Sequence, residues 1–347
     1  MMRNLIFFCL LAILNACQAP RTTEKAFYYW KSLVDLSESE QKTLKNLQVK
    51  KLYVKFFDVT WDAALQRPSP AARVKFKDST SAYLKAEGIE IIPKIFITNE
   101  TIQQILPETV QKLGERIDFL LRDLLDTYRI TGIKEVQIDC DWTEATRDKY
   151  FDLLTYLKTL PLYLNRQLSA TIRLYQCKYQ SKTGIPPVNK GLLMCYNMGN
   201  LKSPSTANSI LDPEELKKYT DNLNSYPLAL DIGLPLFGWK VLFRENVYAG
   251  LIQNLPDSIL QQPELARLSG NQFEILKDST VNGYELKKGD QLRIESSKVD
   301  DIMKTISIIS PLLRAPNFTI SLFHLDSSTL SKFKQNEIES IYSGFNR

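Results

Sequence analysis

The sequence contains very little histidine, since His324 is the single histidine among 347 residues. Zinc sites of the His₃ or mixed Cys/His type are therefore strongly disfavoured, and a Ser-His-Asp triad is excluded unless His324 is its base. A strong charge of one sign is also missing, because 44 Lys and Arg against 39 Asp and Glu give a formal net charge of +5. This small, dispersed charge argues against a nucleic-acid-binding protein. We expect no metal and no cofactor, so carboxylate, tyrosine and amide side chains must carry any chemistry.

The N-terminal apolar run is too short to cross a membrane. Leu5 to Leu14 carries no charge, but a membrane-spanning helix needs about 20 apolar residues. Arg3 precedes this run and small residues follow it, which is typical of an export signal. We therefore predict a signal peptide at residues 1–16.

The stretch Leu14-Asn15-Ala16-Cys17 resembles the processing box of bacterial lipoproteins, in which the cysteine is lipidated and becomes the first mature residue. An ordinary signal peptide with an incidental cysteine is the alternative. Because Cys17 ends the apolar run and a linker-like stretch follows, we predict a lipidated linker at residues 17–26. The expected location is the bacterial cell envelope, with the protein anchored to a membrane by lipid and either periplasmic or surface-exposed.

The remaining chain, residues 27–347, alternates strand-like apolar runs with amphipathic helical stretches. Eight such units favour a (β/α)₈ TIM barrel in the α/β class. An open doubly wound sheet is the alternative, but no Gly-x-Gly-x-x-Gly follows the first strand. The expected strands are Phe27–Trp30, Lys51–Asp58, Ile89–Thr98, Glu135–Asp141, Leu168–Cys177, Gly191–Asn197, Leu228–Phe237 and Phe318–Leu325.

One segment breaks this alternation. Between the seventh strand and the last helices, residues 272–295 form short alternating runs around Asn282-Gly283 and a second glycine turn. Such runs are typical of β-hairpins. We predict a small β-hairpin insertion between strands 7 and 8, on the rim of the barrel.

The fourth strand carries two aspartates on one face. Alternation places Gln137, Asp139 and Asp141 together, opposite an apolar face that suits packing against helices. Two neighbouring carboxylates inside a barrel raise the pKa of one of them, as acid/base chemistry requires. The alternative is a structural ion-pair network with Arg173 on the fifth strand. Barrel active sites lie where the strands end, which favours a functional site.

Strands four, six, seven and eight together resemble the chitinase-type barrels of family 18 glycoside hydrolases. That family ends strand four with Asp-x-Asp-x-Glu, and carries Met-x-Tyr-Asp on strand six, Gly-x-Pro-x-Tyr-Gly on strand seven and an aromatic floor on strand eight. The matching residues here are Asp139, Asp141, Met194, Tyr196, Gly233, Pro235, Gly238 and Phe323. Asn197 stands where the family has Asp, and Phe237 stands where it has Tyr. The resemblance implies a sugar-binding cleft in which Tyr196, Asn197, Arg173, Phe237 and Phe323 contact the substrate. Trp142 and Trp239 each directly follow a motif and are added as expected sugar-stacking residues.

The sequence departs from this family at the proton donor. Thr143 stands where the family has its catalytic Glu, and a threonine hydroxyl is far too weak an acid to protonate a glycosidic oxygen. Glu144 is one residue further along, where strand alternation turns it away from the cleft. The expected catalytic candidates are therefore Asp139, Asp141 and Glu144.

Three functions remain open from the sequence. The first is a glycan-binding lipoprotein, specific for a carbohydrate such as an N-acetylhexosamine-containing glycan, in which hydrolysis is impaired or absent. The second is an active glycoside hydrolase that uses Asp141 or Glu144 as its acid. The third is a cell-envelope scaffold whose rim hairpins bind another protein. We rank binding above catalysis because Thr143 is a specific chemical objection to hydrolysis.

Overall fold

The computed structural model describes residues 21–346, except for residues 253–254 and 270–271. The predicted signal peptide and Cys17 lie outside the described residues. Within the described ranges, no helix is both long and apolar enough to span a bilayer. The first strand begins at Thr22 and includes the fully buried Ala26, so the end of the predicted linker is part of the barrel.

Parallel strands form a closed ring, as predicted, and the open-sheet alternative is excluded. Each strand pairs with its neighbours, and β1 pairs with both β18 and β3, which closes the barrel. In the described part of the chain, the eight barrel strands are β1 (Thr22–Tyr29), β3 (Lys51–Asp62), β6 (Glu90–Ile97), β7 (Glu135–Asp139), β8 (Gln167–Arg173), β9 (Lys190–Met194), β10 (Leu230–Pro235) and β18 (Asn317–Phe323). Short strands beside the ring are β2 (Leu33–Val34), β4 (Arg67–Ala71) and β5 (Lys75–Phe76).

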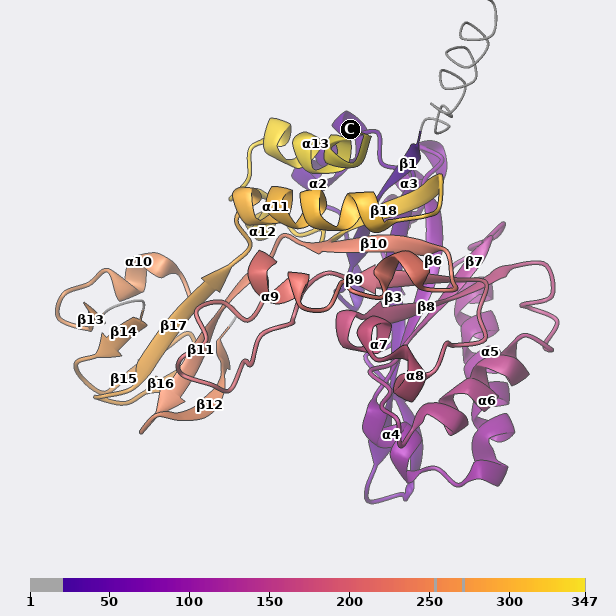
Figure 1. Ribbon diagram of the computed structural model, residues 1–347, viewed down its shortest axis with the longest axis horizontal. Helices are drawn as coiled ribbons and strands as arrows, with labels where there is room; N and C mark the ends of the chain where they lie inside the picture. The colour runs from indigo at the N-terminus through magenta and orange to yellow at the C-terminus, as the bar shows by residue number, and fades with distance from the viewer. Residues whose placement is uncertain (1–20, 253–254, 270–271, 347) are drawn as a thin grey trace, which may run out of the picture.

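Amphipathic helices cover the outside of this ring (Figure 1). In α5, for example, Leu113, Ile117, Leu121 and Leu124 recur at helical spacing and are buried against the barrel. At the start of α2, Ser37 and Glu40 form a reciprocal capping box. The helices are α2 (Glu38–Asn46), α3 (Asp78–Ala86), α4 (Asn99–Gln104), α5 (Val110–Thr127), α6 (Arg147–Leu157), α7 (Leu174–Lys178), α8 (Gln180–Thr183), α9 (Pro213–Lys217), α10 (Asp257–Leu260), α11 (Val299–Ile309), α12 (Ser327–Leu330) and α13 (Gln335–Ser343).

The inside of the barrel is mixed in polarity. Tyr28, Tyr53 and Leu192 pack together at its centre. Near the N-terminal ends of the strands, Lys190 pairs with Glu135 at 2.8 Å and with Asp231 at 2.6 Å. This pairing satisfies charges that would be costly to bury alone.

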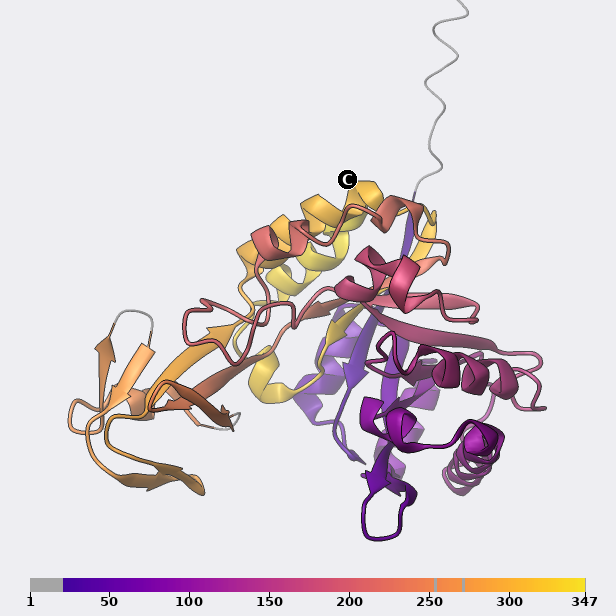
Figure 2. The same ribbon diagram turned by 60° about the horizontal axis from the view of Figure 1, so that its bottom comes forward.

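An antiparallel sheet lies between β10 and α11, at the predicted position between barrel strands 7 and 8. Figures 1 and 2 show it as a lobe that projects from one side of the barrel. The sheet is larger than residues 272–295, because its strands begin at Gly238. They are β11 (Gly238–Arg244), β12 (Val247–Ile252), β13 (Ala266–Ser269), β14 (Gln272–Ile275) and β17 (Gln291–Ser296), with the small hairpin β15 (Ser279–Val281) and β16 (Tyr284–Leu286) beside them.

Glycine is required where this lobe leaves the barrel. A Cβ at Gly238 would lie 2.7 Å from the carbonyl oxygen of Glu295 on the neighbouring strand. The lobe also has an apolar cluster of its own, which includes Ile252, Leu260, Ile275 and Leu292. The close junction and the separate core make it a folded addition to the barrel rim.

Candidate functional site

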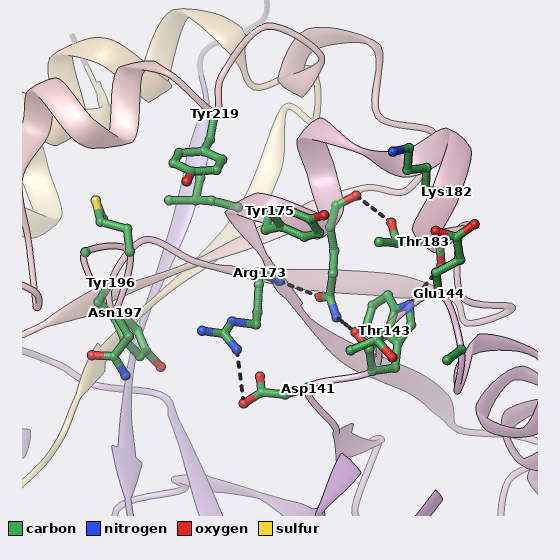
Figure 3. A pocket seen from close by; sticks show the side chains of 16 residues that line it. Asp141, Thr143, Glu144, Arg173, Tyr175, Lys182, Thr183, Tyr196, Asn197 and Tyr219 are labelled. Carbon is green, nitrogen blue, oxygen red and sulfur yellow. Dashed lines mark hydrogen bonds and ion pairs between the residues drawn. The ribbon is translucent and has the colours of Figure 1, made fainter. Parts of the chain in front are cut away.

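A pocket of about 650 Å³ opens at the C-terminal ends of β7, β8 and β9. Asp141, Arg173, Tyr196 and Asn197 line it, and Figure 3 shows these four side chains gathered on one side. They come from three neighbouring strands that end at the same edge of the barrel, where active sites of this architecture lie. The structure therefore brings together four of the residues predicted from the sequence.

Asp139 lies deeper, inside the barrel, where alternation along β7 places it. Its carboxylate is paired with the Lys94 ammonium, with 2.8 Å between Oδ2 and Nζ, and it accepts a hydrogen bond from the Thr171 hydroxyl. Lys94 is almost completely buried, and its Nζ lies 4.1 Å from the ring centre of Trp30. Burial lowers the pKa of Lys94, while the charge of Asp139 opposes that shift. Asp139 thus has its ion-pair partner inside the barrel in Lys94, whereas Arg173, the partner expected from the sequence, pairs with Asp141.

Asp141 is the accessible carboxylate of the site. It follows the end of β7, its side chain is 44% exposed, and its Oδ2 lies 3.3 Å from Nη1 of Arg173. Partial burial raises the pKa of Asp141 above its ordinary value, and the negative charge of Asp139 adds to this rise, whereas Arg173 lowers the pKa. This is the direction that a proton donor needs.

Asp141→Asn is expected to raise the melting temperature by a few degrees at pH 7. The raised pKa means that the folded protein disfavours the charged form, so the wild type loses stability as pH rises through this pKa. The difference in melting temperature between the variant and the wild type should therefore shrink as pH falls toward about 4, where an unfolded aspartate is protonated. Thermal melts followed by circular dichroism between pH 3 and 8 measure this.

Asp152→Asn, on the exposed face of α6, is the matched control and should change little across this range. A lower melting temperature of Asp141→Asn at pH 7 would show that the ion pair with Arg173 outweighs the burial of Asp141.

The turn after β7 places Thr143 and Glu144 differently from Asp141. The Thr143 amide donates to the Thr146 hydroxyl at 2.9 Å, and this hydroxyl donates to Asn99 Oδ1 at 2.6 Å. Both Thr143 and Glu144 are exposed and border the pocket. In Figure 3 the Glu144 carboxylate lies beside Thr183 and Lys182, apart from Asp141 and Arg173. Glu144 therefore does not form a carboxylate pair with Asp141.

Trp142 is not positioned as a sugar-stacking residue. Its side chain is 2% exposed and stacks on Tyr150, with 5.2 Å between ring centres. Its indole N–H donates to the carbonyl oxygen of Thr183 at 2.9 Å. The prediction for Trp142 is wrong, because its ring packs in the core between the barrel and its helices.

An aromatic cluster forms the floor beside the pocket, with Phe323 at its centre. The ring centres of Tyr28, Trp30, Tyr196 and Phe237 lie between 5.3 and 5.7 Å from that of Phe323. Phe323 and Phe237 are half-buried, so part of the apolar surface faces outward. Such flat faces suit the C–H faces of sugar rings. The predicted floor residues Phe237 and Phe323 lie together, and Trp30 is an addition.

Tyr196 joins this floor to the polar residues. Its ring is buried against Phe323 and Phe237. Burial raises its pKa well above the ordinary tyrosine value, and the charge of Asp139 adds to the effect. The hydroxyl therefore stays protonated at neutral pH and can donate a hydrogen bond. Asn197 follows in the left-handed conformation, with φ of 56°, and its side chain is exposed at the rim.

The inserted lobe holds Trp239 beside the floor. Its ring centre lies 5.2 Å from that of Phe237, and its indole N–H donates to Oε2 of Glu295 at 2.7 Å. The same carboxylate accepts a hydrogen bond of 2.5 Å from the Ser209 hydroxyl. Glu295 thus ties Trp239 to the loop at residues 195–212, which carries Asn197.

Arg293 completes this attachment, which we call the lobe clamp and define as Arg293, Glu295 and Ser209. The guanidinium of Arg293 is completely buried and lies 2.7 Å from Oε1 of Glu295. It also donates to the carbonyl oxygens of Ser203 at 2.6 Å and Leu201 at 3.1 Å. The lobe clamp therefore fixes one wall of the site.

The described residues contain no group of three or more His, Cys, Asp and Glu side chains that is arranged to hold a metal ion. Lys94, Trp30 and Glu295 belong to the site but are not among the site residues chosen from the sequence. For Lys94 a signal existed, since alternation along β6 points it into the barrel, where a lysine needs an anionic partner.

No family model matches the sequence, and no curated protein is similar to it. Solved structures, however, share its fold. The spore cortex-lytic enzyme SleL of Bacillus cereus superposes with a TM-score of 0.53 at 16% identity, covering 93% of this chain and 75% of that one. The family 18 chitinase ChiB of Flavobacterium johnsoniae has a TM-score of 0.52 at 12% identity, covering 94% of each chain.

The Group IV chitinase of Ostrinia furnacalis in complex with allosamidin has a TM-score of 0.55 at 12% identity, covering 93% of this chain and 99% of that chain. At these identities the likeness shows the fold alone. The chain has a glycoside-hydrolase-like (β/α)₈ barrel that resembles those of family 18.

Proposed function

We propose that this protein is a lipoprotein of the cell envelope that binds N-acetylhexosamine-containing glycans and does not hydrolyse them. The observation that carries the proposal is the site itself: an aromatic floor with polar side chains beside it, and no carboxylate at position 143. The fold shared with chitinases and a cortex-lytic enzyme supports a glycan as the ligand. Anchoring through Cys17 rests on the sequence of the N-terminus.

The arrangement assigns a contact to each part of the site. A sugar ring that stacks on Phe323 and Phe237 would present its polar edge to Tyr196, Asp141 and Arg173. The Tyr196 hydroxyl and the Asp141 carboxylate would hold an acetamide, as the family resemblance implies. Asn197 and Trp239 would contact more distant parts of the same glycan. These contacts bind a ligand without supplying a proton to its glycosidic oxygen.

Tyr196→Phe is expected to weaken binding of an N-acetylglucosamine tetramer about three- to tenfold, because it removes one hydrogen-bond donor and keeps the ring on the floor. Isothermal titration calorimetry with the purified protein measures the affinity. Tyr163→Phe is the matched control, since Tyr163 is also buried but lies before β8, at the opposite end of the barrel.

Equal affinities of the wild type and Tyr196→Phe would remove Tyr196 from the binding site. Absence of binding by the wild type to every N-acetylhexosamine oligomer on a glycan array would refute the proposed function.

Hydrolysis with Asp141 as the acid is the second candidate, and the raised pKa of Asp141 favours it. The variant Asp141→Asn separates the two functions. If the wild type releases sugar from the tetramer and Asp141→Asn does not, the protein is an enzyme. If neither variant nor wild type shows turnover above the buffer control, binding is the function.

A further inference from the structure

The end of the barrel opposite the pocket has features of a membrane-contacting surface. This basal face consists of the loops that precede the barrel strands, and it includes the start of β1 at Thr22. Hydrogen bonds join the loops to one another: Arg166 Nε donates to the Ile133 carbonyl at 3.0 Å, and the Thr22 amide donates to the Pro316 carbonyl at 2.9 Å. The basal face is therefore a continuous, ordered surface.

An exposed apolar loop projects from the basal face. Residues 160–164 read Leu-Pro-Leu-Tyr-Leu. Tyr163 is buried and fixes the loop, whereas the Leu164 side chain is 65% exposed. Leu160 and Leu162 are partly buried against the core. Burying Leu164 in an apolar medium would be favourable, and nothing in the described residues covers it.

Exposed cations lie in several loops of the basal face, and two of them are near this loop: Lys158 at the end of α6 and Arg129 in the neighbouring loop before β7. Among the described residues, Lys50, Arg129, Lys158 and Arg314 are exposed in basal loops and form no ion pair, whereas Asp126 is an exposed carboxylate near them that also forms none. Other carboxylates at this end are paired with lysines: Glu24 with Lys51, Glu87 with Lys45 and Glu90 with Lys134. The basal face thus carries more unpaired cations than unpaired carboxylates, with Arg129 and Lys158 on the side of the apolar tip.

We propose that the basal face rests on an anionic lipid bilayer. Exposed leucine among unpaired cations is the combination that binds a lipid interface, because the apolar tip enters the acyl boundary and the cations contact the headgroups. The proposal rests on the proposed lipidation of Cys17, which precedes Thr22 by only five residues. Such a tether reaches at most about 18 Å, so the lipid would hold this end of the barrel at the membrane. The pocket then opens away from the bilayer.

The test uses the full lipidated chain, reconstituted into vesicles of phosphatidylcholine with phosphatidylglycerol. Leu164→Cys is labelled with an environment-sensitive dye, which is selective because Cys140, Cys177 and Cys195 are buried. We expect its emission to shift to the blue and to rise on vesicles. The matched control is Leu268→Cys in the inserted lobe, at 62% exposure, and its emission should not change.

Charge is tested with Arg129→Gln combined with Lys158→Gln. Each cation near an anionic surface contributes a factor of about five to the affinity, so the pair should weaken contact of the face about thirtyfold. High salt, or vesicles without phosphatidylglycerol, should also weaken the contact of the basal face with the bilayer.

If the emission of the dye on Leu164→Cys does not shift when the protein is bound to vesicles, the bilayer proposal is overturned. The occupant of the basal face would then be a protein. An emission shift that is the same at low and high salt, and on vesicles with and without phosphatidylglycerol, would refute the role of the cations. Failure of the chain to bind vesicles at all would overturn both lipidation and basal contact, yet calorimetry with the glycan would still test the pocket separately.

Discussion

Thr143→Glu is expected to hydrolyse an N-acetylglucosamine tetramer at least about a hundredfold faster than the wild type, because a positioned general acid contributes roughly 10²- to 10⁴-fold. The residue borders the pocket two positions after Asp141, where the family resemblance places the proton donor. In the proposed function Asp141 and Tyr196 hold the acetamide, so an acid is the part that this variant adds. Release of shorter oligomers, followed by chromatography, measures the rate.

Thr143→Gln is the matched control, since it has the size of glutamate but no acidic proton. Adding Glu144→Gln to Thr143→Glu should leave the new activity unchanged, because the Glu144 carboxylate lies beside Thr183 and Lys182, apart from Asp141 (Figure 3). If Thr143→Glu is no faster than Thr143→Gln, an acid at position 143 is not what the proposed binding site lacks for hydrolysis, and the geometry of the cleft must differ from that of the family.

Arg293→Met is expected to lower the free energy of unfolding by about 3–5 kcal/mol, the usual effect of removing one partner of a buried ion pair. The Glu295 carboxylate would then be buried without its cation, and two carbonyl oxygens of the loop at residues 195–212 would lose their donors. Urea unfolding followed by tryptophan fluorescence measures the change, and Trp239 lies next to the affected pair.

Arg267→Met is the control in the same lobe. Arg267 also pairs with a carboxylate, that of Glu274 at 2.7 Å, but its side chain is largely exposed. Its substitution should therefore lower the free energy of unfolding by only about 0–1 kcal/mol. Similar destabilisation by the two substitutions would contradict a special role for the lobe clamp.

The barrel could be predicted from the sequence because its signals are local. Each strand is an apolar run with a period of two, and the inward position of Asp139 follows from that period alone. The same rule would have placed Trp142 correctly. It shares the face of Ile138 and Cys140, which packs against helices, so its position directly after the motif does not bring it into the cleft.

The partners within the site were harder to predict because they depend on strand register and on distant contacts. Lys94 reaches Asp139 only because β6 pairs with β7 in the register that sets Lys94 opposite Gln137. Glu295 and Ser209 are separated by 86 residues in the sequence, and no short pattern connects them. The lobe was underestimated for a related reason, since β11 begins three residues after β10 ends and the two read as one apolar run.

The lobe clamp has a consequence for motion. A lobe joined to a barrel at its base would ordinarily swing about that junction, and such closure is a common way to grip a ligand. Here Arg293 and Glu295 fasten the lobe to the loop that carries Asn197, so Trp239 and Asn197 move together or not at all. In the proposed function, a glycan would meet a groove whose width is set before it arrives, and little of the binding energy would be spent on ordering the protein.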